Sequence, residues 1–309
     1  MVNVQRLATA LSPFDLVYGA CALLCAGLAL WSHDSVIALI VIITFGLPHG
    51  ALDGELARQI LLPRFGRGWF PVFALPYLTL IACVLACWHI APIWTLNLFL
   101  LFSLLHFGQE LSDGSHPLLS AFVLGGAPLI LPCALQPAQT AALLSGMIAP
   151  TQLSHPPEWL LWLSPIWGCA VIFLIALSPP LLRIKHFALI ATTLIVFWVF
   201  EPLKAFMVYF IFIHAPAHIA ALVHDPRWKR LVSLRTALKL ALPLTIASLM
   251  IGMALWPLYT ASPDQRLLEI TFQLLAALTL PHMIFDLWLR WTSRALHLGS
   301  GKPVTLIGI

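Results

Sequence analysis

Ten long apolar runs dominate this 309-residue chain, and each is long enough to cross a lipid bilayer as a helix. Charged residues make up only 9% of the sequence, against roughly a quarter in an average soluble domain. We therefore predict an all-α fold, a polytopic transmembrane bundle of eight to ten helices that forms a single integral membrane domain over residues 1–309. The predicted spanning segments are 14–32, 36–57, 69–90, 92–111, 118–134, 157–177, 186–201, 203–223, 237–258 and 266–290.

Basic residues are distributed unevenly between the two ends of these segments. If the N-terminus is cytoplasmic, 14 of the 16 Lys and Arg residues fall in cytoplasmic segments, and only Lys204 and Arg266 fall outside. Because cytoplasmic loops of membrane proteins are enriched in Lys and Arg, both termini are predicted to be cytoplasmic. The stretch 135–156 carries no basic residue and is predicted to lie outside, as a loop or a re-entrant or interfacial segment. The expected location is the cell (inner or plasma) membrane, and the low charge excludes a nucleic-acid partner.

Five of the twelve His residues lie inside predicted spanning helices, where ionisable side chains are costly and therefore usually functional. In the predicted topology these helices all run from outside to inside. The five residues lie 11 to 16 positions after the start of their segments, which places them in one layer about 8 Å thick. We predict that they form one shared site in the cytoplasmic half of the bilayer. They are His49, His106, His214, His218 and His282.

Each of these His residues belongs to a motif with a second polar residue four positions later, on the same helix face. The motifs are HGALD (49–53), HFGQE (106–110), HAPAH (214–218) and HMIFD (282–286). The carboxylates Asp53, Glu110 and Asp286 are predicted to accept the second ring N–H of a ligating His or to bind an ion themselves. Pro and Gly residues cluster around the same motifs, which predicts helices kinked around a cavity.

A mostly imidazole ligand set favours Fe, Zn or Cu over Mg or Ca. The sequence contains no H-E-x-x-H motif, which argues against an intramembrane zinc protease. Four His residues on an octahedral ion would leave two open positions for dioxygen, as in a non-haem Fe(II) oxygenase. Two alternatives stay open. A transporter or proton channel would use the His and acidic residues as a relay along a path across the membrane. A bis-His haem protein would use only two of them.

The motifs GLPHGALD (46–53), LHFGQE (105–110), HAPAH (214–218) and TLPHMIFD (279–286) resemble those of the bacterial and archaeal Brp/Blh family of β-carotene 15,15′-dioxygenases. The resemblance extends from about residue 36 to 290. It implies a single Fe(2+) ion held by four residues that also form the catalytic centre. His282 matches a recurring family residue whose role stays open: a fifth ligand, a support for the ligands or a substrate contact. The implied ligands are His49, His106, His214 and His218.

The resemblance also implies the reaction: O2 cleaves the central double bond of β-carotene and gives two molecules of retinal. It implies a functional link to a retinal-binding rhodopsin. The substrate is a rigid hydrocarbon that resides in the lipid bilayer, so an embedded enzyme can take it up laterally. Aromatic residues near the motifs are candidates for the wall of a substrate tunnel, with Trp198, Phe210 and Phe285 as candidate stops for the rings. The full set is Phe45, Phe107, Trp198, Tyr209, Phe210, Phe212 and Phe285.

Overall fold

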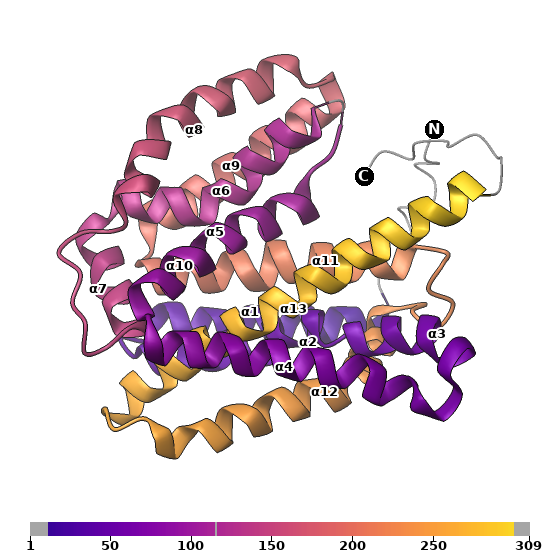
Figure 1. Ribbon diagram of the computed structural model, residues 1–309. Coiled ribbons are helices and arrows are strands. Elements are labelled where there is room, and N and C mark those ends of the chain that lie inside the picture. The colour runs from indigo at the N-terminus through magenta and orange to yellow at the C-terminus, as the bar shows by residue number, and fades with distance from the viewer. Residues whose placement is uncertain (1–11, 115, 300–309) are drawn as a thin grey trace.

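The computed structural model describes residues 12–114 and 116–299, with side chains through residue 289, and confirms an all-α bundle (Figure 1). Its regular structure is helical throughout this part of the chain. The elements are α1 (Pro13–Trp31), α2 (Ser35–Gly50), α3 (Asp53–Phe65), η2 (Gly66–Gly68), α4 (Trp69–Ile90), α5 (Pro92–Leu111), α6 (Pro117–Leu135), α7 (Pro137–Met147), α8 (Glu158–Leu177), α9 (Pro180–Val199), α10 (Pro202–Tyr209), η3 (Phe210–His214), α11 (Ala215–His224), α12 (Leu234–Leu255), η4 (Trp256–Leu258) and α13 (Pro263–Gly299).

Most helices begin where the sequence carries a start signal. α1, α5, α6, α7, α9, α10 and α13 each begin at a Pro residue, which lacks the amide hydrogen that a first-turn residue could not use within the helix. Before α1, the Ser12 hydroxyl accepts a hydrogen bond from the Asp15 amide, and the Asp15 carboxylate accepts one from the Ser12 amide. The Asp34 side chain caps α2 in a similar way. Local sequence therefore fixes many of the helix boundaries.

Among the described residues, eight helical stretches are long and apolar enough to cross a membrane, in agreement with the eight to ten predicted. One of them, Ser35–Ile90, contains both α2 and α4. The predicted single segment 36–57 is wrong, because the chain turns at residues 51–52 and α2 and α3 are separate helices. The stretch 135–156 contains α7, whose 11 residues are too few to span the bilayer. α7 packs on α6, α10 and α13 at one end of the bundle (Figure 1).

Ion pairs join several connections at the end of the bundle opposite α7. Glu55 of α3 lies 2.8 Å from Arg230, in the connection between α11 and α12. Asp113, which follows α5, pairs with Lys185 and His186 near the start of α9. Most of the described basic residues lie at this end, which is the arrangement the charge pattern predicts for the cytoplasmic side. Four residues of that pattern lie outside the described side chains: Arg6, Arg290, Arg294 and Lys302.

Close backbone contact and a lipid-facing exterior complete the bundle. Gly108 of α5 faces Gly125 of α6 so closely that a Cβ atom on Gly125 would overlap the Gly108 backbone. Small residues allow such approaches between membrane helices. The outward faces carry exposed apolar side chains, including Leu24 (70% exposed) and Ile172 (69%). The helices therefore pack closely inside the bundle, and its apolar outer surface is suited to contact with lipid.

Candidate metal centre

His49 stands at the end of α2, where the helix ladder is interrupted by Pro48 and the helix stops at Gly50. Its Nδ1 atom donates a hydrogen bond to the Gly46 carbonyl oxygen, one turn earlier in the same helix. Gly46 is required by packing, because a Cβ atom at this position would overlap the ring of Phe210. The GLPHG sequence thus fixes the His49 ring by a hydrogen bond and, at Gly46, leaves room for the ring of Phe210 against the helix backbone.

His214 and His218 follow a distortion of their helix. Residues Phe210–His214 form one turn of π-helix, in which the Ala215 amide bonds to the Phe210 carbonyl, five residues back. Pro216 has no amide hydrogen, so it cannot make the ordinary bond to the carbonyl of residue 212. Such π-turns are common at functional sites. Here the turn precedes the two His residues of the HAPAH motif.

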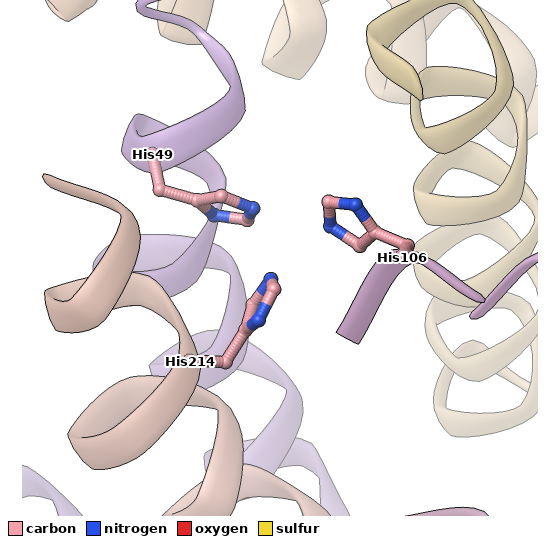
Figure 2. Close-up of side chains that lie close together, drawn as sticks. All are labelled: His49, His106 and His214. Atoms are coloured by element: carbon pink, nitrogen blue, oxygen red, sulfur yellow. The ribbon is translucent and has the colours of Figure 1, made fainter. Parts of the chain in front are cut away.

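The imidazoles of all five predicted residues come together from α2, α5, the η3–α11 segment and α13 (Figure 2 shows three of them). Ring centroids of His49 lie 5.0 Å from those of His214, 5.6 Å from His218, 6.2 Å from His282 and 6.4 Å from His106. His49, His106, His214 and His282 are buried, and the His218 side chain is 11% exposed. The predicted single layer of His residues therefore closes into one cluster.

Two overlapping groups in this cluster have the spacing needed to hold a metal ion. One ligand atom from each of His49, His106 and His214 lies within 4.8 Å of the others, and Figure 2 shows these rings facing one another. His106 also forms such a group with Glu110 and His282. His218 is outside both groups, but its ring centroid lies 5.3 Å from that of His282. The donor set is thus imidazole-rich with one carboxylate.

Hydrogen bonds orient three of the rings. His282 Nδ1 lies 2.9 Å from both oxygens of Asp53, and His218 Nδ1 lies 2.7 Å from Glu110 Oε1. Together with the His49 bond to Gly46, each of these Nδ1 atoms faces an oxygen acceptor. An Nδ1 atom that donates its hydrogen leaves Nε2 with a free electron pair. Metal-ligating His residues are usually held in this manner.

Several polar atoms at the centre of the cluster have no hydrogen-bond partner in the described structure. They include Nε2 of His214, Nε2 of His218 and Oε2 of Glu110, all buried. Unpaired buried polar atoms are rare, and a bound ion is one reason for them. These atoms are metal-ligand types, and the residues present therefore fit a bound transition-metal ion.

The two carboxylates make their shortest contacts with His residues of other helices, not with the His of their own motifs. Asp53 begins α3 after the turn at residues 51–52, so it pairs with His282 of α13 instead of His49. Glu110 Oε1 lies 3.8 Å from His106 Nε2 in its own helix but 2.7 Å from His218 Nδ1, and its Oε2 lies 3.2 Å from His214 Nδ1. Each acid therefore ties two segments of the bundle together.

Asp286, the third candidate carboxylate, lies beyond the His cluster near the connection between α11 and α12. Asp286 is half-buried one turn beyond His282, and its charge acts on Arg227 in the connection between α11 and α12. Hydrogen bonds to Asp225 and the Asp286 charge raise the pKa of the Arg227 guanidinium. Asp286 thus belongs to the charged end of the bundle.

Tyr77 is a site residue that the sequence reasoning missed. Its hydroxyl donates a hydrogen bond of 3.0 Å to Asp53 Oδ2, so Tyr77, Asp53 and His282 form a chain leading to the cluster. Tyr77 lies in α4, far from every His motif, and no local pattern distinguishes it. Its only sequence signal is a phenol within an otherwise apolar helix.

The aromatic tunnel candidates have different surroundings. Phe210 packs edge-on against His49 at 5.3 Å and stacks on His214 at 5.4 Å. Tyr209 is buried against Phe107, at a centroid distance of 5.6 Å. Phe285 packs against aromatic neighbours on α4 and α13. Trp198 is 72% exposed on the outside of α9, so its predicted place in an internal tunnel wall is wrong.

Two apolar cavities meet at the His cluster, and both are lined by His49, His106, Leu275 and Thr279. The lateral cavity lies between α4, α12 and α13. The enclosed cavity lies among α5, α6, α7, α10 and α13, and every residue of its wall is buried or half-buried. The lateral cavity differs because its wall includes Phe70 and Leu78, which are 48% and 49% exposed. The wall of the enclosed cavity is therefore less exposed than that of the lateral cavity, which reaches the lipid-facing surface at Phe70 and Leu78.

Comparisons with known proteins identify the family of this chain. The family model described as β-carotene 15,15′-dioxygenase matches residues 40–290. A protein named β-carotene 15,15′-dioxygenase, from an uncultured marine bacterium, is 28% identical over 80% of this chain and 90% of its own length. A protein named probable β-carotene 15,15′-dioxygenase Blh, from Halobacterium salinarum, is also 28% identical, over 80% of this chain and 81% of its own. No solved structure matches at a significant level. The chain belongs to the β-carotene 15,15′-dioxygenase family.

Proposed function

We propose that this protein is a membrane-embedded non-haem iron dioxygenase that cleaves the central 15,15′ double bond of β-carotene with O2, giving two molecules of retinal. The observation that carries the proposal is a buried His cluster at the junction of two apolar cavities, in a chain of this family. The bacterial inner membrane or an equivalent plasma membrane is the proposed location, and retinal is the proposed supply for a retinal-binding rhodopsin.

The proposed iron ligands are His49, His106, His214 and His218, with His282 held beside them by Asp53. Glu110 orients His218 and lies beside His214, and its negative charge offsets part of the charge of a bound cation. When bound, Fe(2+) would supply the activation of O2 that breaks the carbon–carbon double bond. The protein supplies the position of the polyene and a site shielded from water.

Substrate access is proposed to run through the lateral cavity. β-Carotene dissolves in the hydrocarbon core, and this cavity reaches the lipid-facing surface at Phe70 and Leu78. The molecule would enter between α4 and α12 and pass the His cluster into the enclosed cavity. Phe107 and Phe210 line that cavity beside the cluster and provide flat surfaces for a polyene.

The alternative function is a transporter or proton channel that uses the His and acidic residues as a relay. The test must distinguish it from the dioxygenase. A proton path needs polar groups along its length. The wall of the enclosed cavity beyond the cluster is aromatic and aliphatic apart from the sulfur-containing Cys133 and Met147 and the hydroxyl residues Ser103, Thr140 and Thr279. The test is anaerobic purification and elemental analysis, then addition of O2 with β-carotene and chromatography of the products. One iron per chain and retinal as the product are expected. Iron-loaded protein that leaves β-carotene intact but conducts protons in liposomes would support the relay instead.

A further inference from the structure

The enclosed cavity ends against α7, and this short helix is held rigidly. The Thr140 hydroxyl donates a 2.8 Å hydrogen bond to the Pro132 carbonyl of α6, and the Ser145 hydroxyl accepts one of 2.8 Å from the Leu153 amide. On the side of α13, the Met147 carbonyl accepts a hydrogen bond of 3.1 Å from Gln273 Nε2. Hydrogen bonds on three sides therefore fix the end wall relative to α6, to the segment that follows α7 and to α13, which carries His282.

Leu144 and Met147 present buried side chains to the cavity from this wall, with exposures of 4% and 3%. The hydrogen bond places Met147 level with Gln273, which precedes His282 by nine residues. At about 1.5 Å per residue, the end wall lies roughly 14 Å from the cluster along α13. β-Carotene is about as long as the ~30 Å core of a bilayer, so half of it measures about 15 Å.

The distance from the end wall to the cluster therefore matches half the length of β-carotene. The two cavities differ in whether they can stop a ring of the carotenoid. A ring seated against α7 places the middle of the polyene at the His cluster. The other ring lies in the lateral cavity, which reaches the lipid-facing surface and offers no such wall. Resting on the proposed function, we propose that Leu144 and Met147 are specificity-determining residues: they stop one ring of the carotenoid and so select the double bond that is cleaved.

The test replaces each of the two proposed stop residues with a smaller side chain. In Met147→Ala and Leu144→Ala the ring can enter further, which brings the neighbouring 13,14 double bond to the site. Cleavage there breaks one C=C bond and places one oxygen atom of O2 on each fragment, so a C18 ketone and a C22 aldehyde replace two C20 aldehydes. We expect the C18 and C22 products to rise at least tenfold above their wild-type level in chromatograms of reactions with β-carotene.

Ile148→Ala is the matched control. Ile148 follows Met147 and is 2% exposed, but it does not line the cavity, so its truncation removes a similar apolar group without deepening the cavity. This variant should give retinal alone. Retinal as the only product of both shortened variants would overturn the proposal and leave the dioxygenase function intact. A wild-type protein that forms no aldehyde would overturn both.

Binding of β-carotene to the protein can be measured without catalysis. Met147→Trp fills the end of the cavity, so metal-free protein under argon should bind β-carotene at least tenfold more weakly than wild type, as followed by the carotenoid absorption band. Unchanged affinity in a folded Met147→Trp variant would contradict the proposed seat of the ring. Melting temperatures of all variants show whether each is folded.

Discussion

Replacement of Glu110 tests whether this carboxylate organises the metal centre. Glu110 Oε1 lies 2.7 Å from His218 Nδ1, 3.7 Å from His282 Nε2 and 3.8 Å from His106 Nε2, while Oε2 lies 3.2 Å from His214 Nδ1. One acid thus contacts residues of three helical segments. We expect Glu110→Gln and Glu110→Ala to weaken binding of Fe(2+) while the bundle stays folded.

The magnitude follows from the shortest contact, the 2.7 Å hydrogen bond between Glu110 Oε1 and His218 Nδ1. A hydrogen bond to a charged group contributes about 1.5–3 kcal/mol, and about 1.4 kcal/mol corresponds to a tenfold change in affinity. Glu110→Gln keeps an oxygen that accepts from His218 but loses the negative charge, so we expect about a tenfold loss. Glu110→Ala leaves His218 Nδ1 without this acceptor and also removes the carboxylate that lies beside His214, so we expect about a hundredfold loss.

The assay is anaerobic competition for Fe(2+) between the protein and a coloured chelator, with melting temperature measured in parallel. Glu269→Gln is the matched control, because Glu269 is also a buried acid of a spanning helix, 6% exposed, but its hydrogen bond is with Gln265. It should bind iron as wild type does. If Glu110→Ala binds Fe(2+) within twofold of wild type, the carboxylate does not organise the site and the reasoning is refuted.

Three further predictions follow. Replacing any one of His49, His106, His214 and His218 with Ala should remove most of the iron and activity, measured by elemental analysis and retinal formation; full activity in two of these variants would contradict the ligand assignment. Gly46→Ala should destabilise the fold by about 1–3 kcal/mol, because its Cβ overlaps the Phe210 ring, and a second change, Phe210→Leu, should restore part of the melting temperature. A reporter fused after Lys302, which lies outside the described residues, should be cytoplasmic, whereas one within 135–156 should be external; a cytoplasmic signal from 135–156 would contradict the topology.

The bundle and the His cluster were predictable because the membrane restricts what an apolar sequence can do. Spanning helices are continuous apolar runs, and most of their starts carry Pro or a capping residue, as Ser12 does for α1. The wrong prediction of one spanning helix over residues 36–57 has the same physical basis. The sequence is apolar through Leu52, and hydropathy does not register that α2 ends at Gly50 beside Pro48. The turn that follows decides where Asp53 lies.

What the sequence could not provide is the rotation of each helix about its axis and the identity of its neighbours. Position along a spanning helix gives depth at about 1.5 Å per residue, so His residues on four segments could be assigned to one layer. Depth does not say that Asp53 faces His282, or that Tyr77 of α4 reaches the same carboxylate. Trp198 was predicted to line a tunnel because it lies near the motifs along the chain, although its side chain is 72% exposed. The candidate ligands could be grouped from the sequence because each helix carries its own, whereas the residues that orient them belong to neighbouring helices and depend on packing.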